Sequence, residues 1–208
     1  YVDVNVDRAA LQSAIALGRA RRSFSLVFDP ASARSSLRVE DEQVDAQPGA
    51  FVRRFNPKLR IVLAGRGWEI VAMSQLAQTA DCELVVASQE SATLEFCRPY
   101  ADQLIQLTVP RAVPDLPLDA DTAVACLFHE HEWEAQLLLN ALRSPAFYVG
   151  ALGSRQTQRR RVEVLEALGA TPEELARLKA PIGLFPSQDP RSLAMSALAE
   201  IVKIRTAS

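Results

Sequence analysis

The stretch LRIVLAGRGWEI at residues 59–70 decides how the fold of this chain is interpreted. A mainly apolar run ends in the triplet Gly65-Arg66-Gly67, and a helical pattern follows to about Ala80. Apolar strands of this kind are typical of parallel sheets that are covered on both faces. The segment therefore predicts the first strand, turn and helix of an α/β domain.

The alternation of apolar strands and helices continues to the C-terminus. Further strands are predicted at residues 82–87, 104–107, 123–128 and 146–150. Helices are predicted at residues 132–142, 154–168 and 191–203, with Gly169 closing the second and Thr171-Pro172-Glu173-Glu174 starting a short one. Right-handed crossovers wind such units into a doubly wound, mostly parallel, Rossmann-like sheet, which we expect over residues 57–208.

A different pattern precedes Asn56-Pro57. Residues 7–18 predict a helix, with Asp7 as N-cap and Gly18 as terminator. Alternating apolar residues then predict three strands, at residues 24–28, 37–40 and 51–55. Residues 1–56 are therefore expected to form a small α+β piece, part of an N-terminal domain.

The composition narrows the class of protein. With 49% hydrophobic and 23% charged residues, the chain is too apolar to be disordered. Its formal net charge of -2 argues against nucleic-acid binding. No run of residues approaches the roughly 20 that a membrane helix needs, and no signal peptide is visible.

The three cysteines, Cys82, Cys97 and Cys126, form no CxxC pair, so neither a disulfide framework nor a zinc ribbon is expected. A reducing, cytoplasmic location fits them. Cys82 and Cys126 lie in apolar runs and are expected to be buried, Cys97 less so.

Ligands of a doubly wound sheet bind beyond the carboxyl ends of its strands, at the point where the strand order reverses. That rule selects three segments, Gly65–Trp68, Phe128–Trp133 and Gly150–Arg155.

In the first segment, glycines permit a tight turn and close approach of a phosphate to backbone N–H groups. Ile70 stands where the third glycine of a dinucleotide motif belongs, and Ser88-Gln89 stand where an acid would hold a ribose. The sequence therefore does not favour ordinary NAD binding. Arg66, Ser88 and Gln89 could tolerate an extra phosphate, or the glycines only make a compact turn.

The second segment holds both histidines of the chain, His129 and His131. Their i, i+2 spacing differs from the i, i+4 spacing of metal-binding helices, so no protein metal site is expected. The segment either caps the next helix or places His129 in contact with a ligand.

The third segment reads Gly150-Ala151-Leu152-Gly153-Ser154-Arg155. Two glycines, a predicted N-cap at Ser154 and the positive end of a helix favour an anion here, with Arg155 as its charged partner. The later arginines, Arg159 to Arg161, are interpreted as a solvated basic helix face.

Taken in order, these segments resemble the XdhC/CoxI family of accessory proteins for molybdenum hydroxylases. The resemblance rests on AFYVGALGSRQTQRRR at residues 146–161, TPEELARLKAPIGL at 171–184 and LAMSALAEIV at 193–202. The matching positions are Gly150, Gly153, Ser154, Arg155, Arg160, Arg177, Pro181, Ile182, Gly183, Leu184, Ala199, Glu200 and Ile201, with His129 on a histidine that follows the fourth sheet strand of the family.

The resemblance implies a Rossmann domain that binds molybdenum cofactor (molybdopterin), protects it, assists its sulfuration and passes it to xanthine dehydrogenase-type apoenzymes. It also implies a homodimer, and a cysteine desulfurase as a further partner. The cofactor-binding residues expected are Gly65, Arg66, Gly67, Ser88, His129, Gly150, Gly153, Ser154 and Arg155, and no residue is expected to be catalytic.

The chain departs from the family at its first glycine turn, which reads G-R-G-W-E rather than G-A-G-H-V, and at Ser88-Gln89. It also has no match to the glycine-rich stretch with a cysteine in the family's N-terminal domain. Two alternatives stay open: an NAD(P)-dependent oxidoreductase, or a degenerate Rossmann module that binds only a protein partner.

Overall fold

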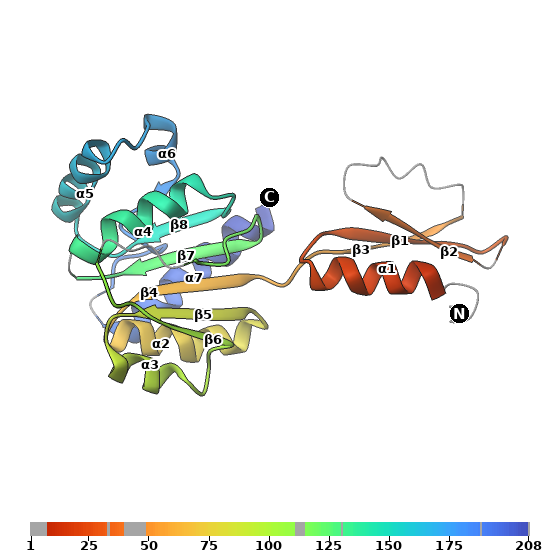
Figure 1. Ribbon diagram of the computed structural model, residues 1–208, viewed down its shortest axis with the longest axis horizontal. Coiled ribbons are helices and arrows are strands. Elements are labelled where there is room, and N and C mark those ends of the chain that lie inside the picture. The colour runs from red at the N-terminus through yellow and green to blue at the C-terminus, as the bar shows by residue number, and fades with distance from the viewer. Residues whose placement is uncertain are drawn as a thin grey trace. The chain divides into compact units, whose positions relative to one another are not determined.

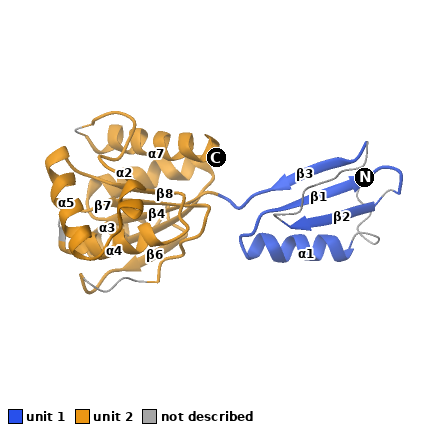
Figure 2. Cartoon of the chain, turned by 90° about the horizontal axis from the view of Figure 1, so that it is seen from above, with its two compact units in different colours: residues 1–58 blue, residues 59–208 orange. Residues whose placement is uncertain are grey.

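The computed structural model describes residues 8–32, 34–39, 49–110, 115–129, 131–187 and 189–207. It confirms the α/β class: a six-stranded parallel sheet and a separate three-stranded antiparallel sheet. The chain divides into two compact units, Tyr1–Lys58 and Leu59–Ser208, which are coloured blue and orange in Figure 2.

The smaller unit packs helix α1 (Arg8–Arg19) on a sheet of order β2-β1-β3. Its strands are β1 (Phe24–Asp29), β2 (Arg34–Val39) and β3 (Phe51–Phe55). The rings of Phe24 and Phe55 stack across the sheet with centroids 5.1 Å apart. The predicted terminator Gly18 lies inside α1, and it is Arg21, just after the helix, that has a positive φ of 51°. The proposed N-cap Asp7 lies outside the described residues.

The larger unit holds six parallel strands in the order β6-β5-β4-β7-β8-β9 (Figure 1). This is the 3-2-1-4-5-6 order of a Rossmann sheet, and the order reverses between β4 and β7. The strands are β4 (Arg60–Gly65), β5 (Glu83–Ser88), β6 (Gln103–Gln106), β7 (Thr122–Leu127), β8 (Tyr148–Ala151) and β9 (Leu178–Lys179).

Helices cover both faces of this sheet, because alternate strand residues enter two separate cores. Ile61 and Leu63 pack with α2 (Trp68–Ala77), α3 (Ser91–Cys97) and α7 (Pro190–Ala207). Val62 and Ala64 pack on the opposite face with α4 (His131–Arg143), α5 (Arg155–Ala167) and Leu175 of α6 (Pro172–Ala176). A short 3-10 turn, η1 (Gln78–Ala80), continues α2.

Two elements were not predicted from the sequence, the short helix α3 and the two-residue strand β9. Cys126 is buried as predicted, but the other two cysteines differ from expectation. Cys97 on α3 is fully buried and accepts a hydrogen bond from Ser74, whereas Cys82 is only partly buried. Burial raises the pKa of the Cys97 thiol, so this residue is a core thiol rather than a surface one.

The sequence motifs of the C-terminal half meet inside the larger unit. The Tyr148 hydroxyl donates to the Glu200 carboxylate, which also accepts the Gly183 N–H at 2.9 Å. Burial and the Glu200 carboxylate hold the pKa of Tyr148 well above its usual range, so the phenol remains a donor. Strand β8, the loop before α7 and α7 itself are joined through one carboxylate.

Arg177 connects a second set of elements. Its guanidinium donates to the carbonyls of Leu142, Ser144 and Ala146, at 2.9 Å for Ser144. These carbonyls belong to the end of α4 and the approach to β8, where helix termini leave acceptors unsatisfied. Arg177 therefore has a structural role.

Gly65 lies at the carboxyl end of β4, where this strand packs against the end of β7. Its φ is +149°, and a Cβ at this position would lie 2.6 Å from the backbone carbonyl carbon and oxygen of Leu127. Only glycine permits this approach without moving the backbone of β7.

We expect Gly65→Ala to destabilise the larger unit by about 2 kcal/mol, because the new methyl group meets backbone that cannot rotate away. Gly169→Ala is the matched control: its φ is +84°, but its nearest neighbour, Arg143, lies 4.0 Å from the Cβ position. Urea unfolding followed by circular dichroism should give the larger loss for Gly65→Ala. Equal losses would mean that the Leu127 contact contributes nothing.

Candidate functional site

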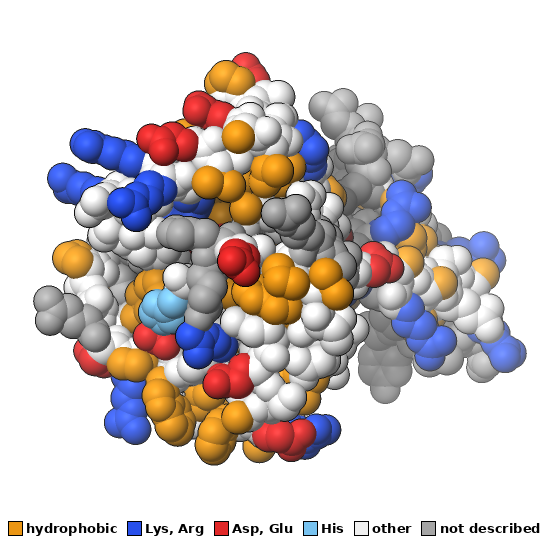
Figure 3. All heavy atoms as spheres, turned by 60° about the vertical axis from the view of Figure 1, so that its left-hand side comes forward, with side chains coloured by type: hydrophobic (Ala, Val, Ile, Leu, Met, Phe, Trp, Pro, Cys, Tyr) orange, Lys and Arg blue, Asp and Glu red, His pale blue; other side chains and the backbone are white. Residues whose placement is uncertain are grey.

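The three segments selected from the sequence all lie at the carboxyl edge of the larger sheet. They follow β4, β7 and β8, and β7 lies between the other two. The two glycine turns are therefore separated by two strand spacings, roughly 10 Å. Figure 3 turns this edge toward the viewer and shows a histidine beside acidic, basic and apolar side chains.

The first turn is tied to helix α3. Gly67 has a φ of +84°, and its N–H donates to the Thr93 hydroxyl at 3.0 Å. Thr93 in turn donates to the Glu90 carboxylate. The backbone donor that would approach a phosphate in a dinucleotide site is thus used within the protein.

A carboxylate and a histidine face each other across the reversal of strand order. Glu69 Oε1, in the first turn of α2, lies 3.7 Å from Nε2 of His129, which follows β7. A Cβ on Gly67 would be 3.3 Å from Glu69 Oε2. Because Glu69 already complements the positive end of α2, its charge opposes an anion at this turn.

A side-chain hydrogen-bond acceptor next to the end of β5 has no donor among the described residues. The buried Ser88 hydroxyl accepts the Glu90 N–H at 3.1 Å, and the Gln106 amide donates to the Gln89 carbonyl. Oε1 of Gln89 is buried and has no hydrogen-bond partner among the described residues. An unpaired buried acceptor is uncommon in proteins, and a ligand N–H or O–H would satisfy it.

The third turn confirms the predicted N-cap. Ser154 Oγ accepts the Thr157 N–H at 3.2 Å at the start of α5. Gly153 has a φ of +138°, and a Cβ there would lie 2.9 Å from the Thr157 side chain. The hollow of the turn is thus filled by its own helix, while Arg155 is exposed on the first turn of α5.

Gly150 lies apart from the other candidate residues. It is inside β8, where a Cβ would come within 2.9 Å of Tyr148 and Ile182 side-chain atoms. Its lack of a side chain accommodates packing, so we assign it to the core rather than to the sheet edge.

The interpretation of Arg161 as part of a solvated face was wrong. Arg161 is 3% exposed and donates to Glu134 of α4 at 2.7 Å. It also donates to the Leu152 carbonyl and to Gln158. Arg159 and Arg160 are exposed, as predicted. The spacing of Arg161 to the core residue Leu165, one turn later, was the available signal.

The Glu134–Arg161 pair lies beside Cys126 in the core under the third turn. Burial, then the Glu134 charge, raises the pKa of Cys126 well above its usual range. Buried ion pairs depend on both partners, because a single remaining charge has no solvent to screen it.

Arg161→Met should therefore lower the free energy of unfolding by about 3–5 kcal/mol, measured in urea. Adding Glu134→Leu should recover most of that loss, since no charge then stays buried. Arg160→Met, at an exposed position of the same helix, serves as control and should change stability by no more than about 0.5 kcal/mol. An Arg161→Met variant as stable as the parent would contradict this account.

A sequence model of the XdhC Rossmann domain matches residues 61–201, which is well over half of the chain. The chain belongs to the XdhC family. The resemblance drawn from the C-terminal motifs is thus confirmed, and this XdhC domain coincides with most of the larger unit.

Curated relatives agree with the assignment. The chain is 29% identical over 186 residues to the molybdenum cofactor insertion chaperone PaoD of Escherichia coli (strain K12), covering 89% of this chain and 52% of PaoD. It is 27% identical over 167 residues to a probable xanthine dehydrogenase subunit of Bacillus subtilis (strain 168), covering 77% and 47%. The chain thus spans about half the length of these two relatives.

A crystal structure described as a xanthine dehydrogenase from Bacillus halodurans shares the fold, with a TM-score of 0.76 and 19% identity. The alignment covers 99% of this chain and 66% of that one.

In the part of the XdhC chain that the structure describes, no helix has the length and apolar character needed to cross a membrane.

Proposed function

We propose that this protein binds molybdenum cofactor and delivers it to apoenzymes of the xanthine dehydrogenase type. Membership of the XdhC family and the name of the relative PaoD support this role. The geometric observation that carries it is the reversal of strand order between β4 and β7, where ligands of such sheets bind.

The cargo would be held by side chains at this edge rather than by bare glycine turns. Arg155 supplies a charge-assisted donor for a phosphate, and Arg66 a second cation on the β4 side. Gln89 Oε1 accepts from a ligand hydroxyl or amine. His129, exposed beside Glu69, contacts the ligand from the end of β7. Ser88, Gly65, Gly67, Gly153 and Ser154 shape the turns around it.

The alternative of an NAD(P)-dependent oxidoreductase is less well supported. A pyrophosphate would need the Gly67 N–H, which donates to Thr93, and would meet the Glu69 carboxylate at the start of α2. A module that only binds a protein partner is the second alternative, and the name of the relative PaoD favours cofactor handling over it. The homodimer and the cysteine desulfurase partner stay predictions from the family resemblance.

The test is retention and transfer of cofactor. The protein purified from cells that make molybdenum cofactor should carry molybdopterin, measured as its fluorescent oxidation product, and should activate a xanthine dehydrogenase-type apoenzyme. Arg155→Ala should lower the retained cofactor about tenfold, the effect of losing one charge-assisted hydrogen bond.

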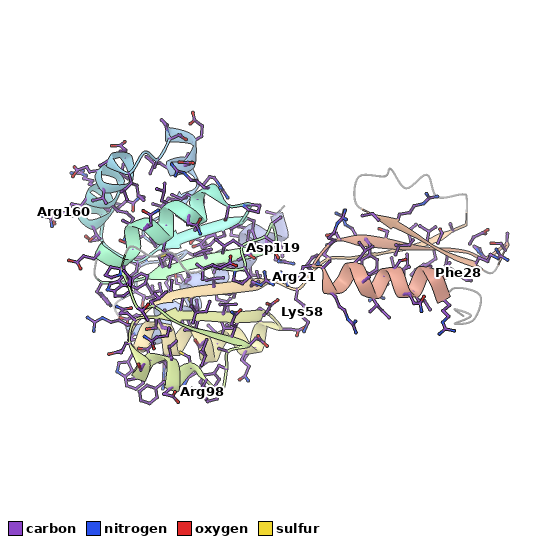
Figure 4. All side chains as sticks on the ribbon, in the orientation of Figure 1. Arg21, Phe28, Lys58, Arg98, Asp119 and Arg160 are labelled. Carbon is purple, nitrogen blue, oxygen red and sulfur yellow. The ribbon has the colours of Figure 1, made fainter. Side chains whose placement is uncertain are left out.

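Arg160→Ala is the matched control. Arg160 lies on the same helix but about 140° around its axis from Arg155, and Figure 4 shows it pointing outward from α5. This variant should retain as much cofactor as the parent protein. If both variants retained less cofactor, retention would depend on the overall positive charge of α5 and not on Arg155 in particular. If neither retained less, Arg155 would not belong to the site. A parent protein without molybdopterin or transfer activity would refute the function itself.

A further inference from the structure

A hollow with no role in the site above lies between helices α2 and α7. It has a volume of about 310 Å³ and is lined by Trp68, Val71, Ala72, Gln75, Asp189, Pro190 and Arg191. A second hollow of about 320 Å³ continues along the same two helices toward Met195. We refer to the first as the α2–α7 pocket. Its size is at the lower end of the range for small-molecule sites.

Trp68 forms an aromatic wall of this pocket. It follows the first glycine turn directly and is 63% exposed. Its ring contacts Phe96 of α3, with centroids 5.3 Å apart and planes tilted by 38°. Phe96 thus holds the indole from one side while the indole lines the pocket. A large exposed ring held in this way is a surface on which a planar ligand can stack.

Polar groups lie at the mouth of the pocket. Asp189 caps α7, its Oδ1 accepting the N–H groups of Arg191 at 3.1 Å and Ser192 at 2.9 Å. Hydrogen bonds from Ser192, first from its side chain and then from its backbone, lower the pKa of Asp189 and keep it anionic. Gln75 donates to the Tyr100 hydroxyl at 3.3 Å, which fixes the amide. A carboxylate, an amide and the Arg191 guanidinium thus surround an aromatic wall.

We infer that the α2–α7 pocket binds the pterin ring of the cargo, stacked on Trp68, with Asp189 accepting N–H groups of its pyrimidine edge. This inference rests on the proposed function, which supplies the pterin. A pterin combines a flat heteroaromatic ring with adjacent N–H donors, and it meets a flat indole and an anionic acceptor here.

A purely apolar segment of a protein partner fits the pocket less well. Such a segment would desolvate Asp189 and Arg191 without replacing their hydrogen bonds to water. A pterin replaces them with donors and acceptors of its own. The chemistry of the lining therefore favours the heteroaromatic ring.

The test uses Trp68 as its own reporter. The chain has two tryptophans, so Trp133→Phe leaves Trp68 as the single source of tryptophan fluorescence. Titration of this variant with neopterin monophosphate should quench the fluorescence saturably, and inorganic phosphate alone should not. Free tryptophan, titrated in parallel, corrects for light absorbed by the pterin.

Calorimetry with the same pterin compares the variants. Trp68→Leu should weaken binding about tenfold, as expected for a lost stacking platform, and Trp68→Phe should retain most of the affinity. Asp189→Asn should also weaken binding about tenfold, although asparagine keeps the helix cap and hence the melting temperature. Asp29→Asn is the control, since Asp29 accepts bonds from Ala31 and Ser32 in the smaller unit.

Unchanged pterin affinity in both Trp68→Leu and Asp189→Asn would overturn the inference. It would also be overturned if Trp68→Leu lost capture of the apoenzyme while its pterin affinity stayed normal, because the pocket would then be a protein docking surface. Failure here is distinct from failure of the proposed function. A parent protein that retains molybdopterin, and whose Trp68→Leu variant retains as much, keeps the function and loses only this site.

Discussion

The close approach of β4 and β7 is the constraint on which the rest of the larger unit depends. Gly65 lets the two carboxyl ends meet at a distance that any side chain would prevent. Since the strand order reverses there, the helices that follow β4 and β7 leave toward opposite faces of the sheet. The crevice that opens between them brings Glu69 and His129 together from segments sixty residues apart.

The helix starts around this crevice are satisfied mainly by the protein itself. Thr93 accepts from the first turn, Ser154 caps α5, and Asp189 caps α7. Fewer backbone N–H groups are therefore available to bind a phosphate than is usual at the edge of a Rossmann sheet. In the proposed function, recognition would then fall to three side chains: Gln89, whose Oε1 has no partner among the described residues, the exposed Arg155, and the indole of Trp68.

The sequence predicted features whose causes are local. The run LRIVLA forms β4 because its alternate residues enter two cores, and the N-caps Ser154 and Thr171 act within one helical turn. Helix α3 and strand β9 are too short to show a period, and packing against the sheet stabilises them. The burial of Arg161 depends on Glu134, 27 positions earlier, so the spacing to Leu165 could indicate a core-facing position but not the ion-pair partner.

Some of the residues that identify the family hold the framework of the domain, whereas others, Arg155 and His129 among them, lie at the proposed site. Gly150, Arg177, Gly183 and Glu200 are engaged in packing or in hydrogen bonds that hold β8, α4 and α7 together. Trp68, Ser88 and Gln89 lie at positions where the chain departs from the family pattern, and they surround the crevice and the α2–α7 pocket. This framework leaves the parts of the sheet edge outside the motifs free to vary. Under the proposed function, differences in ligand between members are therefore expected at residues 66–69 and 88–90, beside the shared Arg155.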